Sequence, residues 1–140
     1  MRAFIVSLSL LALAGCSSFQ AKDASAVPPD RLLGYQQEDN GSAKLEVQRD
    51  LGFLGGGCMV AFKIDRQLAA RIAVGEIASF HLPPGQHIVG IGADEKGEGL
   101  CSKARLLREL NVDLVAGQTT QFRIISDAQT GFDIKPAENK

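Results

Sequence analysis

An alternation of apolar and polar residues between short turns limits most strongly what this chain can fold into. Successive side chains of a strand point to opposite faces, so an alternating run indicates a strand with one buried face. Such runs occupy 44–48, 60–65, 68–72, 78–82, 110–115 and 121–124, and turn-forming residues separate them at 65–67, 74–76, 83–85, 116–118 and 130–131. Many short strands with regular turns predict a mostly β chain, folded as a sandwich or a barrel.

Two segments have a pattern that also fits a helix. Residues 66–73 are rich in alanine and could form a helical turn. Residues 103–114 place four leucines on one helical face and space Arg105 and Glu109 four residues apart, as in a helical ion pair. We prefer a strand for 103–114, and the helix stays open as the alternative.

The composition fits one folded domain. The chain has 140 residues, of which 45% are hydrophobic and 22% are charged, as in ordinary globular proteins. The formal net charge is −1. Nucleic-acid binding needs a clustered basic surface, so we expect no nucleic-acid partner.

The first 15 residues have the pattern of a secretory leader. Met1-Arg2 is positively charged, and Phe4–Ala14 is apolar apart from two serines. This run is too short to cross a bilayer as a helix, but it fits the core of a signal peptide. Leu13-Ala14-Gly15-Cys16 resembles the bacterial lipoprotein signal, in which the cysteine is acylated and becomes the new N-terminus. The alternatives are an ordinary secretory signal and a buried N-terminal helix.

The resemblance to lipoprotein signals implies lipid on Cys16 and a membrane as partner. Two or more acyl chains make membrane anchoring stable, whereas one chain is marginal. Ser17 rather than Asp follows the cysteine, which resembles signals sorted to the outer membrane of Gram-negative cells. We therefore expect an outer-membrane lipid anchor that faces the periplasm.

The chain divides into four parts on this interpretation. Residues 1–15 are the signal peptide, and 16–30 are the acylated cysteine and a flexible tether, because this stretch is polar and lacks periodicity. Residues 31–135 form the folded domain, and 136–140 form a C-terminal tail. Leu32, Leu33 and Tyr35 are expected to pack on the domain edge, although a wholly disordered lead-in is the alternative.

The two cysteines that remain after Cys16 predict one disulfide. An even number of cysteines in an oxidising compartment favours pairing, and Cys58 and Cys101 both follow glycine-containing segments that can adapt to a bridge. The alternative is two buried free thiols.

Several short motifs resemble a family of small bacterial lipoproteins with a PEGA-like β-sandwich of unknown function. They are Val47-Gln48-Arg49-Asp50, the glycine run before Cys58, Val74-Gly75-Glu76, and Leu82-Pro83-Pro84-Gly85-Gln86-His87. The resemblance covers about 43–126 and implies a small antiparallel β-sandwich in a surface-layer or envelope-assembly module. The Pro-Glu-Gly-Ala tetrapeptide itself is absent, and Asp65-Arg66 stands where Asp-Gly is usual.

His81 and His87 flank a turn at Pro83, Pro84 and Gly85, and we expect these five residues to form a recognition hairpin. A two-residue loop would place the histidines on opposite faces, and a three-residue loop could bring them together. Two ligands are too few for a structural zinc site, so we expect no metal and no cofactor here.

Other candidate sites lack the residues that their chemistry needs. Gly55-Gly56-Gly57 is not followed by the Lys-Ser or Lys-Thr of a phosphate loop. Asp94, Glu95 and Glu98 form an acidic loop without the ligand order of an EF-hand. No nucleophile-elbow motif is present.

The sequence therefore favours a non-catalytic structural or binding module of the cell envelope, and its partner would be an envelope protein or peptidoglycan. The alternative is a carrier with an apolar cavity between its sheets, and an enzyme is the third hypothesis.

Overall fold

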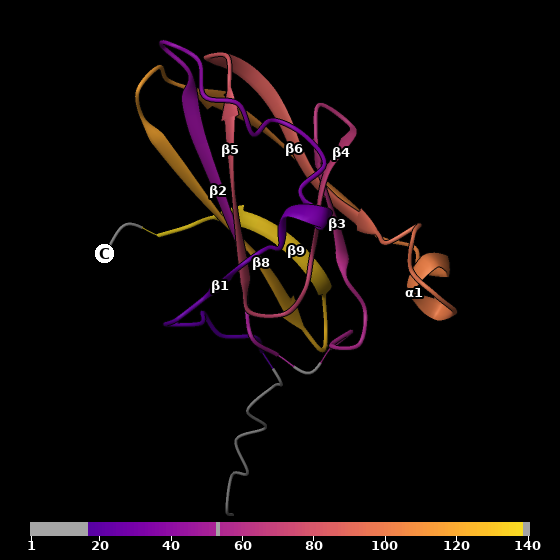
Figure 1. Cartoon of the computed structure of the whole chain (residues 1–140). Coiled ribbons are helices and arrows are strands. Elements are labelled where there is room, and N and C mark those ends of the chain that lie inside the picture. The colour runs from indigo at the N-terminus through magenta and orange to yellow at the C-terminus, as the bar shows by residue number, and fades with distance from the viewer. Residues whose placement is uncertain (1–16, 53, 139–140) are drawn as a thin grey trace, which may run out of the picture.

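The computed structural model describes residues 17–52 and 54–138, and they form two β-sheets (Figure 1). The elements in chain order are β1 (Ser25–Ala26), η1 (Pro29–Arg31), β2 (Ala43–Arg49), β3 (Val60–Ile64), β4 (Gln67–Ile72), β5 (Glu76–Leu82), β6 (Gly85–Ala93), α1 (Leu100–Lys103), β7 (Leu107–Leu114), β8 (Thr119–Asp127) and β9 (Gly131–Pro136). Among these residues, no helix has the length and apolar character needed to cross a membrane.

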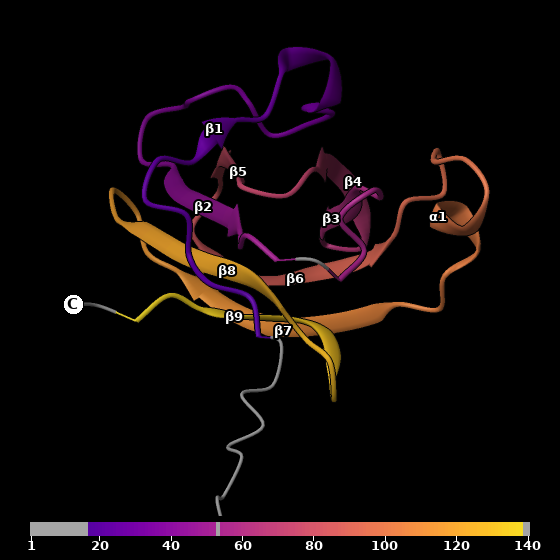
Figure 2. The same cartoon turned by 90° about the horizontal axis from the view of Figure 1, so that it is seen from below.

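The sheets pack face to face, which confirms the predicted mostly β sandwich. One sheet has the order β1-β5-β2-β8-β9 and the other β4-β3-β6-β7. Seen from below, β9 lies beside β7, so the two layers approach each other along one side of the molecule (Figure 2). The β2–β8 and β1–β5 pairs are parallel, and the other pairs between these strands are antiparallel.

Alternation along the strands explains where the core lies. In β2, Ala43, Leu45 and Val47 are buried, and the residues between them are half-buried. The rings of Phe62 and Phe80 come from different sheets and stack with their centroids 5.3 Å apart. Burial of these apolar side chains supplies the main force that holds the layers together.

The two ambiguous segments are strands over most of their length. Residues 107–114 form β7, which pairs with β6 along its whole length, and 67–72 form β4. Helix α1 at 100–103 covers only the start of the stretch that also fitted a helix. The same leucines fit a strand equally well, because β6 supplies the backbone hydrogen bonds that a strand needs. The preferred strand is therefore confirmed for 107–114.

Residues 17–30 do not form the predicted flexible tether but lie along the sandwich. We call residues 17–42 the N-terminal strap. Ser17 bridges to Asp127, β1 pairs with β5, and the side chain of Val27 is 3% exposed. The polar composition of this stretch predicted a tether because the few apolar residues that fix the strap contact strands distant in sequence, and such contacts leave no local pattern.

The register defines two ends of the sandwich. We call the end at which the strap begins the near end, and Leu51, Glu76 and Asp127 lie there. At the far end β2 begins at Ala43, which pairs with Leu82. The strap runs from the near end towards the far end, where the amide of His81 donates a hydrogen bond to the carbonyl of Tyr35 at 2.8 Å.

Candidate functional site

The predicted hairpin at His81–His87 is wrong, because its two strands belong to different sheets. β5 pairs with β1 and β2, whereas β6 pairs with β3 and β7. Pro83 and Pro84 lack an amide hydrogen, so this link cannot extend a ladder of strand hydrogen bonds, and the chain crosses between the layers. His81 and His87 are therefore in different sheets.

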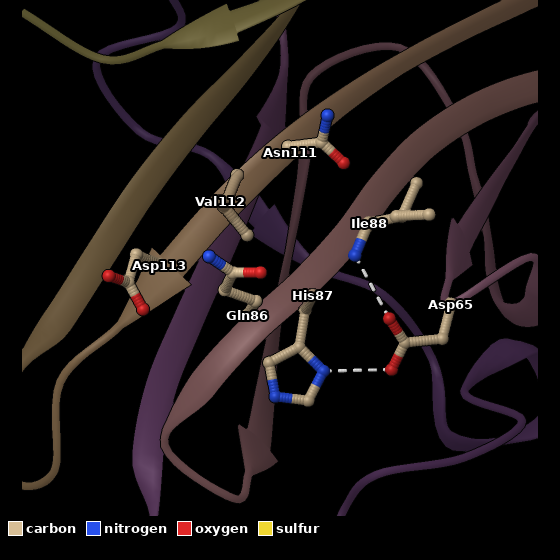
Figure 3. A pocket seen from close by; sticks show the side chains of 7 residues that line it. All are labelled: Asp65, Gln86, His87, Ile88, Asn111, Val112 and Asp113. Atoms are coloured by element: carbon tan, nitrogen blue, oxygen red, sulfur yellow. Dashed lines mark hydrogen bonds and ion pairs between the residues drawn. The ribbon is translucent and has the colours of Figure 1, made fainter.

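His87 connects two turns at the far end. Its Nδ1 lies 2.8 Å from Oδ2 of Asp65, and its Nε2 lies 2.7 Å from the carbonyl oxygen of Pro83 (Figure 3). Both partners are acceptors, so both contacts are hydrogen bonds only when the imidazole is doubly protonated. Burial opposes protonation, but the hydrogen bonds to Asp65 and Pro83 and the charge of Asp65 outweigh it and raise the pKa of His87.

Asp65 fixes the same corner through its main chain and side chain. Its φ is 49°, in the left-handed region that Asp tolerates better than most residues. Its Oδ1 accepts a hydrogen bond from the amide of Ile88 at 2.9 Å, and its own amide donates to the carbonyl of Ile88 at 2.7 Å. Burial would raise the pKa of Asp65, but the hydrogen bonds from His87 and Ile88 lower it on balance.

These residues border an open polar groove of about 600 Å³ at the far end (Figure 3). Its lining is Asp65, Gln86, His87, Ile88, Asn111, Val112 and Asp113. Asn111 and Asp113 were missed as site residues in the sequence. The alternation over 110–115 predicted that these polar residues lie on one face of a strand. It did not show that they line a groove with Gln86 and Ile88, because that depends on the register that pairs Ile88 with Asn111 and Gln86 with Asp113.

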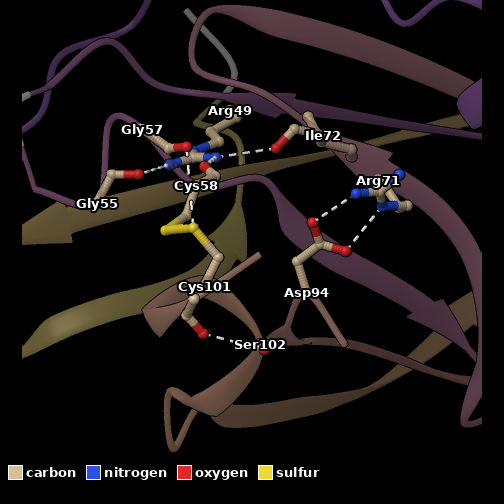
Figure 4. Close-up of a disulfide and its surroundings, with 10 residues drawn as sticks. Arg49, Gly55, Gly57, Cys58, Arg71, Ile72, Asp94, Cys101 and Ser102 are labelled. Carbon is tan, nitrogen blue, oxygen red and sulfur yellow. Dashed lines mark hydrogen bonds and ion pairs between the residues drawn. A yellow bond between two sulfur atoms is a disulfide. The ribbon is translucent and has the colours of Figure 1, made fainter. Parts of the chain in front are cut away.

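The predicted disulfide between Cys58 and Cys101 is present (Figure 4). It links the loop after β2 to α1 across a sequence separation of 43 residues. Because it closes a long loop, it limits the conformations of the unfolded chain and so stabilises the fold, in the chain-entropy model by about 4 kcal/mol.

Arg49 is buried beside this disulfide, with 2% of its surface exposed. Its Nη1 donates to the carbonyl oxygens of Cys58 at 2.8 Å and Ile72 at 2.9 Å, and Nη2 donates to Gly55 at 3.2 Å (Figure 4). The guanidinium also lies 5.3 Å from the ring centre of Phe132. Burial lowers the pKa of Arg49 to about 10, so the side chain stays charged at neutral pH. Its inward position follows from the alternation of β2, which sequence reasoning had not extended to an arginine.

The acidic loop does not form a cluster of free carboxylates. Asp94 is 3% exposed, and both its oxygens accept hydrogen bonds from Arg71 at 2.7 Å (Figure 4). These bonds lower the pKa of Asp94. Glu95 and Glu98 are not part of this ion pair, and across 17–52 and 54–138 no group of three His, Cys, Asp or Glu side chains is arranged to hold a metal.

An apolar cavity of about 290 Å³ opens between the sheets beside the disulfide. Met59, Val60, Leu106 and Phe132 supply apolar walls, and Arg49 lies at its border. This cavity is the feature that a carrier of small apolar ligands would need.

The predicted signal peptide at 1–15 and the lipid site at Cys16 lie outside the described residues. The structure does describe Ser17 and the residues after it, which are bonded to the near end of the sandwich.

The sequence matches no model of a known protein family and no curated protein. Among solved structures, the chain is similar to the N-terminal domain of AlgF from P. aeruginosa, with a TM-score of 0.40 and 14% sequence identity. The similarity covers 73% of this chain and 100% of that domain. At this distance it supports no argument about function, and the resemblance to PEGA-like lipoproteins stays a prediction.

Proposed function

We propose that this chain is a lipoprotein anchored to the outer membrane through Cys16, with a non-catalytic module that binds another component of the cell envelope in the periplasm. The observation that supports it best is the layout of the sandwich. Ser17, the residue that follows Cys16 in the sequence, lies at the near end, and the polar groove lies at the far end. An anchor at one end leaves the groove accessible at the other.

The disulfide supports a secreted location independently of the leader. Disulfides persist in oxidising compartments such as the periplasm and are rare in the cytosol. Cys58 and Cys101 are consumed by the bridge, so Cys16 is the thiol that remains for a lipid.

The groove suits recognition by hydrogen bonds. Gln86 and Asn111 offer amide donors and acceptors, and Asp113 offers a carboxylate. Both ring nitrogens of His87 are bonded within the protein, which favours a structural role for this residue over that of a catalytic base. A polar partner such as an envelope protein or peptidoglycan fits this lining, and the link at Pro83-Pro84 borders the same end.

The lipid anchor is tested by metabolic labelling with a palmitate analogue in cells that express the full chain. We expect the wild type to carry the label and Cys16→Ala to lose it, because the acylated thioether needs the Cys16 sulfur. Cys58→Ser/Cys101→Ser is the matched control and should keep the label. Label that persists in Cys16→Ala contradicts the proposal.

A carrier of small apolar ligands is the second candidate function, and the 290 Å³ cavity beside the disulfide favours it. A medium-chain fatty acid that raises the thermal stability of the domain would support the carrier over the binding module.

A further inference from the structure

The near end of the sandwich exposes two large apolar side chains beside the start of the strap. Phe19 is 62% exposed and Leu54, in the loop after β2, is 43% exposed. The main chains of Phe19 and Leu51 hold these segments together through hydrogen bonds of 3.0 and 2.9 Å. The exposed Leu100 and Leu107 belong to α1 and to the start of β7, on the side of the second sheet, and α1 stands apart from the strap in Figure 1. Phe19 and Leu54 thus lie at the same end of the sandwich, where exposed apolar side chains suit a contact surface.

The strap joins the sandwich without slack. The amide of Ser18 donates to the carbonyl of Ser126 at 2.8 Å, and the Oγ of Ser18 accepts from the amide of Ser126 at 2.9 Å. The same hydroxyl donates to Asp50 at 2.9 Å. Gly52 packs so closely that an added Cβ would lie 3.2 Å from the Cβ of Ser18. These contacts fix residues 17–19 on the domain.

Covalent geometry then limits how far the domain can stand from its anchor. Consecutive Cα atoms are about 3.8 Å apart, so Phe19 lies within about 11 Å of the Cα of residue 16. The headgroup layer of a bilayer is itself about 5–8 Å thick. A domain joined to an acylated Cys16 with no free linker must therefore rest on the membrane.

We propose that the near end of the sandwich is a membrane-contact surface, which seats Phe19 and Leu54 in the interface of the bilayer that holds the acyl chains of Cys16. This inference rests on the proposed acylation. Contact of the near end with the membrane would orient the domain, because the seven-residue strand β2 places the far end about 20 Å from the near end. The polar groove then faces away from the membrane.

Tryptophan fluorescence tests the seating directly, because the chain contains no Trp. Single variants Phe19→Trp and Leu54→Trp report on the near end. Val115→Trp is the matched control, since Val115 is 50% exposed and lies at the far end. Each acylated full-length protein is reconstituted in phosphatidylcholine vesicles, with or without bromine on the lipid acyl chains, and flotation with the vesicles is measured in parallel.

We expect brominated lipid to quench Phe19→Trp and Leu54→Trp about twofold, as for side chains at interfacial depth, and to leave Val115→Trp unchanged. A second set of variants carries a ten-residue Ser-Gly linker between Cys16 and Ser17, which keeps the fold and the anchor but adds slack. The linker should reduce the quenching at both near-end positions.

Each other outcome overturns the inference in a distinguishable way. Proteins that float but show equal quenching at positions 19, 54 and 115 have an anchor without seating, so the proposed function survives alone. Blue-shifted emission at 19 and 54 that brominated lipid does not quench means that a protein surface covers the patch. Failure of the wild type to be acylated and to float removes the proposed function and the seating together.

Discussion

At the scale of single residues, buried charge is concentrated where loops must be held. The guanidinium of Arg49 donates hydrogen bonds to carbonyl oxygens of the loop after β2 and of β4. It therefore links these two segments through neutral acceptors rather than through an ion pair. Arg has the planar set of donors for such a task, which Lys lacks. Arg31 holds the strap in a related way, through two hydrogen bonds to Glu76 at 2.7 and 2.6 Å.

The contact between His87 and Asp65 predicts a pH-dependent contribution to stability. The folded state raises the pKa of His87 above its ordinary value of 6.5, so the contribution is full below that pH and is lost as pH rises through the raised pKa. We expect His87→Ala to lower the free energy of unfolding by about 1 kcal/mol at pH 5.5 and by less at pH 8.5, measured by urea denaturation. Asp65 is 45% exposed, so solvent screening keeps the effect small.

Asp65→Asn is the matched control for this pH effect. Asn tolerates the left-handed backbone of position 65 but carries no charge. In that background the cost of His87→Ala should no longer depend on pH. A cost that is equal at both pH values in the wild-type background, or larger at pH 8.5, would show that the pair is not charged.

At the scale of elements, the strap is a packed part of the fold. Val27 is buried, and the Arg31 and Glu76 side chains are only 12% and 13% exposed. We therefore expect trypsin to cleave after Arg31 far more slowly in the native protein than in urea, because proteolysis follows local opening. Val27→Ser should speed this cleavage about tenfold by weakening apolar packing. Mass spectrometry of the fragments gives the rates, and native cleavage after Arg31 as rapid as in urea would contradict a packed strap.

The same elements show what a sequence reveals and what it hides. Alternation is local, so the strand over 43–49 and the choice of strand at 107–114 could be predicted. Pairing is not local: the parallel register of β2 with β8 joins residues about 75 positions apart, and no short motif signals it. Pro83-Pro84 marked a turn correctly, but the turn does not reveal which sheet each flanking strand enters. The groove was missed for the same reason.

At the scale of the whole molecule, the two ends differ in character. The near end has the start of the strap, the exposed Phe19 and Leu54, and the disulfide-linked loop. The far end has the polar groove and the His87–Asp65 contact. The proposed anchor at Cys16 would give this polarity a direction relative to the membrane, and that direction is the basis of the proposed binding role.

The mass of the intact protein extracted from membranes tests the central claim most directly. After alkylation without a reductant, we expect a chain that begins at Cys16, has the added mass of its acyl groups and takes up no alkylating reagent. Reduction before alkylation should add two equivalents, at Cys58 and Cys101. A chain that keeps residues 1–15, or one with an unacylated Cys16, would contradict the account.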